Sequence, residues 1–311
     1  MKVVAVNNIY KSFGDNIALN NLSLGIEEGE IFGLLGPNGA GKSTTINILS
    51  GLLNQDKGDI SIFNKNIRMH LNEIKQNMGV VPQDLAIFEE LTAYENISFF
   101  ASLYGIQAKE RNKKTIEALA FVGLEEKAKE KVKSFSGGMK RRLNIACGIA
   151  HKPRLIIMDE PTIGIDPQSR NHILNSIKVL NQKGASIIYT THYMEEAEAL
   201  CDRMAIIDKG CVIASGTAES LRDIISDKNT VFIGLRDISK VDESILLNIK
   251  GVEDIYFKDG VLQVVSKKEV ICLDKVIAYL AEAGASIMDV KTKSPNLEDV
   301  FLNLTGRSLR D

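Results

Sequence analysis

A glycine-rich segment that contains a lysine and two hydroxyl residues is the strongest chemical signal in the sequence. Gly36 to Thr44 reads GPNGAGKST and fits the pattern GxxxxGK[ST], between an apolar run typical of a strand and one typical of a helix. Glycines let successive backbone N–H groups turn toward a polyphosphate, and the start of a helix adds its dipole. We therefore expect Lys42 to reach the terminal phosphates and the Ser43 hydroxyl to bind Mg²⁺. The predicted nucleotide contacts in this phosphate loop are Asn38, Gly39, Ala40, Gly41, Lys42, Ser43 and Thr44.

Two adjacent carboxylates follow a second apolar run. Residues 155–158 are continuously apolar, and Asp159 and Glu160 come directly after them. A buried strand that ends beside the phosphate loop would place this pair at the bound nucleotide. We expect Asp159 to hold Mg²⁺ through water, and Glu160 to polarise the water that attacks the terminal phosphate.

A serine and two glycines open a predicted helix between these two motifs. Ser136, Gly137 and Gly138 precede the helical run MKRRLN, and the N-terminus of such a helix can bind an anion. Taken alone, the serine is more typical of a plain helix N-cap than of an anion site. With the phosphate loop before it and the paired carboxylates after it, the segment resembles the signature motif of ABC ATPases.

The resemblance to ABC nucleotide-binding domains extends over about residues 1–220, with every motif in the family's order. It implies that Phe13 stacks on adenine, with Tyr10 as the competing aromatic residue. It also implies that Gln83, in VVPQD, contacts Mg²⁺ and the attacking water, and that His192 contacts the γ-phosphate.

The signature segment differs from the family's commonest form at Phe135, where leucine is usual, and at Met139, where glutamine is usual. Together with THYMEEAEALCDR and the terminal SPNLEDVFLNLTG, this variation resembles the ATPases of ABC-2 type, daunorubicin-resistance-like exporters. Residues 164–167 resemble the D-loop, which crosses the dimer interface, with isoleucine in place of the usual leucine. In this family the signature of one subunit covers the ATP of the other, so the resemblance implies a homodimer that encloses ATP, and a separate transmembrane permease.

The hydrophobic pattern predicts the elements that position these residues. Apolar runs alternate with helical stretches from Glu30 onward, which predicts a parallel sheet covered on both faces, the RecA-like α/β core of a P-loop NTPase. Residues 1–30 read as an antiparallel β subdomain, and about residues 84–150 as a helical insertion. The nucleotide-binding domain is expected to end near residue 220, and residues 221–311 to form an accessory α+β domain.

The composition limits the classes of partner. The chain has 311 residues, of which 44% are apolar and 25% charged, as in ordinary globular proteins. The formal net charge of -2 gives no support for nucleic acid as a partner. The 4 cysteines lack the close spacing of a zinc or thioredoxin-like site, and they predict reduced core residues. We expect no secretory signal, and residues 97–106 are too few to span a membrane.

These observations predict the ATP-hydrolysing subunit of an ABC exporter, held by its permease at the cytoplasmic face of the cell membrane. The main alternative is an ABC ATPase that acts on ribosomes or DNA, but one cassette without heptads or a basic arm favours transport. A non-catalytic scaffold is disfavoured because no chemical residue is missing. The predicted catalytic residues are Lys42, Gln83, Glu160 and His192, and the predicted Mg²⁺ ligands are Ser43, Gln83 and Asp159.

Overall fold

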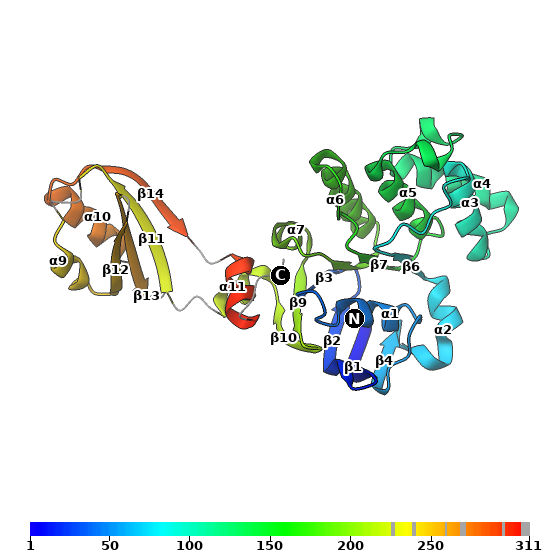
Figure 1. The fold of residues 1–311 in the computed structure, drawn as a ribbon, viewed down its shortest axis with the longest axis horizontal. Helices are drawn as coiled ribbons and strands as arrows, with labels where there is room; N and C mark the ends of the chain where they lie inside the picture. Colours follow the sequence, from blue (N-terminus) through cyan, green and yellow to red (C-terminus); the bar gives the residue numbers. More distant parts are fainter. Residues whose placement is uncertain (225–227, 238–240, 259, 268–271, 294–295, 306–311) are drawn as a thin grey trace. The chain divides into compact units, whose positions relative to one another are not determined.

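The computed structural model describes residues 1–224, 228–237, 241–258, 260–267, 272–293 and 296–305. Within them the chain divides into two compact units, which are coloured along the sequence in Figure 1. The first unit comprises Met1–Ala218 together with Leu304 and Thr305, and the second comprises the described part of Glu219–Asn303.

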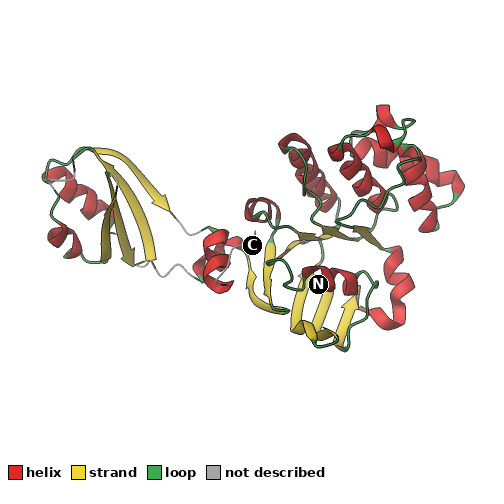
Figure 2. Ribbon diagram, viewed as in Figure 1, coloured by secondary structure: helices red, strands yellow, loops and turns green. Residues whose placement is uncertain are grey.

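A six-stranded sheet forms the centre of the first unit (Figure 2). Its strand order is β10-β9-β3-β8-β7-β6, and neighbouring strands are parallel except for β9 and β10, which are antiparallel. Strands β3, β7 and β8 are buried at every position, because both faces of the sheet are covered. The strands are β3 (Ile31–Leu35), β6 (Met78–Val81), β7 (Leu155–Asp159), β8 (Ser186–Thr190), β9 (Arg203–Asp208) and β10 (Cys211–Gly216).

The strand order determines where the chemical residues meet. Because β8 lies between β3 and β7, the loops that follow these parallel strands open at the same edge of the sheet. The loop after β3 contains Lys42 at the start of the next helix, the end of β7 carries Asp159, and His192 follows β8. The predicted parallel core is confirmed.

Helices cover one face of the sheet, and a second, antiparallel sheet covers the other. In Figure 1, α5, α6 and α7 lie above β3, β6 and β7, while α1 and the antiparallel strands lie below them. The antiparallel order is β2-β1-β4-β5, and its apolar side chains share one core with α1 and β3. These elements are β1 (Lys2–Phe13), β2 (Asn16–Glu27), β4 (Lys57–Ile62), β5 (Lys65–Asn66), α1 (Lys42–Leu49), α2 (Ile67–Gln76), α6 (Pro167–Gln182) and α7 (Met194–Leu200).

The predicted helical insertion is present and has a hydrophobic core of its own. Thr92 and Glu95 form a capping box at the start of its first helix, and their side chains accept hydrogen bonds from backbone N–H groups that have no acceptor within the helix. Ile97, Leu119 and Leu143 are buried in the shared core of the three helices. The helices are α3 (Ala93–Leu103), α4 (Ala108–Phe121) and α5 (Gly137–Ile149), with short 3-10 turns at Glu125–Lys127 and Val132–Ser134.

The second unit combines helices with a four-stranded antiparallel sheet. Its antiparallel sheet has the order β12-β13-β11-β14, and Ile233, Leu262 and Leu280 are buried in its core. No helix in the described part of the chain has both the length and the apolar character needed to cross a bilayer. The remaining elements are α8 (Ala218–Asp223), β11 (Lys228–Leu235), α9 (Glu243–Leu247), β12 (Val252–Lys258), β13 (Val261–Lys267), α10 (Leu273–Glu282), β14 (Ile287–Lys293) and α11 (Leu297–Thr305).

Candidate active site

Most of the predicted nucleotide-binding residues line one cavity of about 360 Å³. It lies between the end of the β1–β2 hairpin, the phosphate loop and the loops that follow β6 and β7. Three predicted site residues do not line it. Ala40 and Asp159 are sequence neighbours of lining residues, and His192 contacts Glu160, which lines the cavity. The lining residues are Phe13, Asn16, Ile17, Ala18, Pro37, Asn38, Gly39, Gly41, Lys42, Ser43, Thr44, Gln83 and Glu160.

Two glycines allow the phosphate loop to pack closely against neighbouring backbone. A Cβ on Gly36 would lie 2.3 Å from the carbonyl oxygen of Ile207. Gly41 has a φ of 107°, and a Cβ there would lie 2.7 Å from the carbonyl oxygen of Ala18. Helix α1 starts at the next residue, and no side chain caps it. Its first N–H groups are therefore available to an anion.

Lys42 is a buried cation that faces its own loop. Its Nζ donates hydrogen bonds to the carbonyl oxygens of Gly36, at 2.6 Å, and Pro37, at 3.1 Å. Burial lowers the pKa of Lys42, and the carboxylates of Glu160 and Asp159 oppose this shift. A polyphosphate in the cavity would supply the anionic partner that the buried ammonium group lacks.

Thr190, at the end of β8, contacts both residues of the acidic pair. Its hydroxyl donates to Asp159 Oδ1 at 2.6 Å and accepts from the backbone N–H of Glu160 at 2.8 Å. Both carboxylates are buried. Glu160 has a φ of 45°, in the left-handed region, which costs a residue with a Cβ on the order of 1 kcal/mol. The sequence did not indicate Thr190, although it is a polar residue at the end of an apolar run.

Three of the predicted catalytic residues meet at one oxygen atom. Oε2 of Glu160 lies 3.4 Å from Nε2 of Gln83 and 3.4 Å from Nδ1 of His192. The Gln83 amide donates to the carboxylate, and His192 forms an ion pair with it when protonated. This arrangement can orient one water molecule and polarise it.

Two side chains of α5 hold the loop that contains Gln83. Arg141, which is buried, donates from Nη1 to the carbonyl oxygens of Gln83, at 2.7 Å, and Pro82, at 3.3 Å. Asn144 donates to the same oxygen of Pro82 at 3.3 Å. The helical insertion and the Gln83 loop are therefore connected directly. The sequence did not indicate Arg141 or Asn144, because a polar helix face is ordinarily solvated.

The signature residues lie outside this cavity. Ser136 caps α5, where its Oγ accepts from the backbone N–H of Met139 at 3.3 Å, and both Ser136 and Gly137 are exposed. Gly138 is buried against the start of α6, where a Cβ would lie 2.3 Å from the Oγ of Ser169. Within one chain, the structure does not bring these residues to the phosphate loop.

Of the two candidate aromatic residues, only Phe13 lines the cavity. Its side chain is 50% exposed at the end of β1, and the Nζ of Lys11 lies 5.4 Å from the ring centroid. The ring of Tyr10 instead faces Lys57, whose Nζ lies 5.7 Å from its centroid.

We predict that Phe13→Ala weakens ATP binding by about 1 kcal/mol or more, because it removes an exposed aromatic face on which a base can stack. The turnover number should change little, since the ring would hold the base and not the γ-phosphate. Isothermal titration of ATP and steady-state kinetics would measure the two effects, with Tyr10→Ala as the matched control. If Tyr10→Ala lowers the affinity and Phe13→Ala does not, the choice of aromatic residue is wrong.

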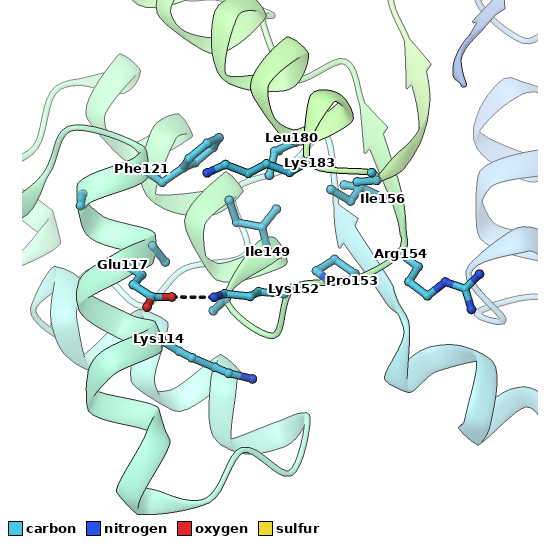
Figure 3. A pocket seen from close by; sticks show the side chains of 15 residues that line it. Lys114, Glu117, Phe121, Ile149, Lys152, Pro153, Arg154, Ile156, Leu180 and Lys183 are labelled. Carbon is cyan, nitrogen blue, oxygen red and sulfur yellow. Dashed lines mark ion pairs between the residues drawn. The ribbon is translucent and has the colours of Figure 1, made fainter. Parts of the chain in front are cut away.

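A second, larger cavity of about 780 Å³ lies between α4, the end of α5 and the end of α6 (Figure 3). Its basic residues are largely engaged: Lys152 pairs with Glu117 at 2.8 Å, and Arg154 turns away to pair with Glu28 at 2.6 Å. None of the predicted catalytic or nucleotide-binding residues lines it. The cavity at the phosphate loop is therefore the candidate active site.

Comparison with known proteins identifies the family. Residues 19–163 match the family model described as ABC transporter. The linearmycin resistance ATP-binding protein LnrL of Bacillus subtilis is 44% identical over 316 residues, covering 99% of this chain and 100% of that protein. The Nod factor export ATP-binding protein I of Bradyrhizobium diazoefficiens is 38% identical over 310 residues, covering 97% of this chain and 95% of that protein.

Solved structures agree with these relatives. A dimeric ATP-binding cassette in a post-hydrolysis state, bound to ADP and phosphate, superposes with a TM-score of 0.63 at 30% identity. The match covers 69% of this chain and 98% of that one. The resemblance drawn from the sequence is thus confirmed, and the chain belongs to the ABC transporter family.

Proposed function

We propose that this chain is the ATP-hydrolysing subunit of an exporter, that it works as a homodimer closed on ATP, and that it drives a separate permease at the cytoplasmic face of the membrane. The observation that carries the proposal is that residues of the phosphate loop, Gln83 and Glu160 line the same cavity. Membership of the ABC transporter family supports ATP hydrolysis, and the relative named for Nod factor export supports the direction. A role on ribosomes or DNA is not favoured.

In the proposed mechanism, Glu160 orients and polarises the attacking water, while Gln83 and His192 fix the direction of its carboxylate. Lys42 exchanges the carbonyl oxygens of its own loop for oxygens of the terminal phosphates. The N–H groups at the start of α1 bind the phosphate chain.

Magnesium fits the residues at this edge of the sheet. The Ser43 hydroxyl, the Gln83 amide and the Asp159 carboxylate are oxygen donors of the kind that Mg²⁺ prefers alongside phosphates. The described residues include no cluster of three or more His, Cys, Asp or Glu side chains suited to a metal, so most of the ligands would come from the nucleotide and water. Bound Mg²⁺ would neutralise charge on the phosphates.

Dimer formation is supported by the position of the signature residues. Ser136 and Gly137 are exposed, and they do not line the cavity of their own chain. In a second chain they could cover the γ-phosphate with a hydroxyl and the N-terminus of α5. The solved relative described as a dimer bound to ADP and phosphate supports the same arrangement.

The permease contact is proposed for a groove of about 560 Å³ between the core and the helical insertion. Leu52 and Leu103, which are 73% and 65% exposed, line it from the two sides. Phe100 also lines it, and its ring lies 5.5 Å from that of the exposed Phe99. An apolar groove of this kind accepts a short amphipathic helix. A permease helix seated here would contact both parts that move when the dimer closes.

Leu103→Glu is expected to abolish co-purification with the permease, because the docked helix would have to bury a charge in place of an apolar contact. The ATPase rate of the isolated chain should stay within about twofold of wild type, as for surface substitutions elsewhere. Pull-down from membranes that contain the permease would measure the loss. Ile116→Glu, which changes an exposed apolar residue on α4, is the matched control. Equal retention of both variants would rule out this groove.

We also assign an accessory role, in dimer contact or regulation, to the second unit. It has its own hydrophobic core, in which α9 and α10 pack with a four-stranded sheet. None of the proposed catalytic residues belongs to it. The identity of the exported substrate depends on the permease, where its binding surface lies.

A further inference from the structure

Glu196, on α7, is a buried carboxylate outside the proposed catalytic set. It is 4% exposed, and its Oε2 accepts hydrogen bonds from the hydroxyls of Tyr189, at 2.7 Å, Thr162, at 2.8 Å, and Thr191, at 2.9 Å. Burial and the Glu196 carboxylate hold the pKa of Tyr189 well above its ordinary value, so the phenol is a donor. Thr162 lies in the segment after Glu160, Tyr189 in β8, and Thr191 directly before His192.

The other oxygen of Glu196 faces Arg170. Nε of Arg170 lies 3.4 Å from Oε1 of Glu196, and neither atom has a hydrogen-bond partner. Arg170 belongs to α6, which Asp166 caps by accepting from Ser169 at 2.8 Å. The ion pair therefore connects the start of α6, next to the D-loop-like residues, with α7. Removal of the Arg170 charge would leave the buried carboxylate of Glu196 without an ion-pair partner, which is costly.

A chain of ring contacts continues from this pair to the reaction site. The guanidinium carbon of Arg170 lies 4.4 Å from the centroid of the Tyr193 ring. That ring lies 4.2 Å from the imidazole of His192, at an interplanar angle of 39°. Nδ1 of His192 lies 3.4 Å from Oε2 of Glu160. The backbone N–H of Tyr193 also donates to Thr191, at 3.0 Å, whose hydroxyl donates to Glu196.

We propose that Arg170 and Glu196 are positioning residues that hold the segment 191–193 so that His192 faces Glu160, and that they couple the start of α6 to hydrolysis. The inference rests on the proposed ATPase site and deepens it. Neither residue lines the nucleotide cavity. Contact of a second chain with the residues before α6 would move Arg170, and through Tyr193 it would move the imidazole. Because His192 contacts the carboxylate of Glu160, closure of the dimer would then determine the direction in which that carboxylate points.

The direct test is the position of the His192 imidazole resonance in the nucleotide-free full chain. The chain has 4 histidines, so their Hε1 signals can be separated by NMR and that of His192 assigned by its loss in His192→Ala. Arg170→Lys keeps the charge but removes the planar group that stacks on Tyr193, and Glu196→Gln removes the buried charge. Both variants should move the His192 signal while the signals of His70 and His151 stay in place. Glu195→Gln, an exposed neighbour on α7, is the matched control and should leave all of them unchanged.

Kinetics provide the second readout. Arg170→Lys should lower the turnover number by about 10-fold to 100-fold, the range typical of residues that orient a catalytic group, with little change in the KM for ATP. A purely structural role predicts instead an unmoved His192 signal, or a loss of activity that matches a loss of folded protein. Because Arg170 is partly exposed, its lysine variant should fold even if Glu196→Gln does not.

The NMR and kinetic measurements together distinguish a failure of this inference from a failure of the proposed function. An unmoved His192 signal together with wild-type turnover in Arg170→Lys would overturn the coupling and leave the ATPase assignment in place. If the wild-type chain did not hydrolyse ATP, the NMR arm would still decide whether Arg170 and Glu196 position His192.

Discussion

The Glu160→Gln variant should bind ATP like the wild type and hydrolyse it about 10²-fold to 10⁴-fold more slowly, the usual contribution of a positioned general base. Glutamine keeps the length of the side chain and can still pair with Gln83, but it lacks the charge that polarises water. The loss of charge also removes repulsion against the γ-phosphates. Two chains should therefore close on ATP and remain closed.

Analytical ultracentrifugation in low salt would measure this closure. The variant should sediment with ATP at twice the mass of the 34.2 kDa chain, while the wild type returns to monomer as it hydrolyses. Adding Ser136→Arg should abolish the dimer, because the exposed serine would meet the partner's γ-phosphate. Glu125→Gln, in an exposed turn of the helical insertion, is the control. Turnover of Glu160→Gln at the wild-type rate would require another base.

Lys42→Ala should remove hydrolysis and weaken ATP binding by about 3–5 kcal/mol, the usual cost of removing one partner of a buried charge pair. The ammonium group is buried, so water screens its charge poorly and its attraction to the phosphates is strong. Most of the loss should appear in the dissociation constant for ATP, because Lys42 contacts phosphates already in the ground state. Titration calorimetry with ATP would measure it.

Lys178→Ala, an exposed lysine on α6, is the control for Lys42→Ala, and it should bind ATP normally. The melting temperature without nucleotide separates an effect on binding from an effect on folding. Retention of wild-type turnover by a folded Lys42→Ala variant would contradict the assignment of the phosphate loop.

The sequence was sufficient for the parts of the site that are local in the chain. The phosphate loop is a strand, a glycine turn and a helix start within one segment, so spacing alone predicts the position of Lys42. Asp159 and Glu160 were predictable because a buried parallel strand ends where they begin. Assignment of Gln83 and His192 needed the family resemblance, because each is a single polar residue at the end of a strand.

The sequence was insufficient where side chains from distant segments meet. Thr190 contacts the Asp159 carboxylate and the backbone N–H of Glu160, and Arg141 holds the Gln83 loop, through contacts that no periodicity encodes. The choice between Phe13 and Tyr10 was open for a different reason. The pairing of β1 with β2 shifts register between Ile9 and Lys11 and again before Ser12. The alternation of side chains between the two faces of the sheet is therefore interrupted before Phe13, and sequence spacing does not tell on which face its ring lies.

The exposed position of Ser136, away from the phosphate loop of its own chain, has a consequence for inheritance. In the proposed homodimer each ATP site takes Lys42 from one chain and Ser136 from the other. A chain damaged only at Ser136 still pairs with a normal chain and disables one of the two sites, while the site formed by its own Lys42 and the normal chain's Ser136 stays complete. Conversely, a chain that lacks Lys42 and a chain that lacks Ser136 can restore one complete site between them. Two alleles that are each inactive alone would then complement each other in the same cell.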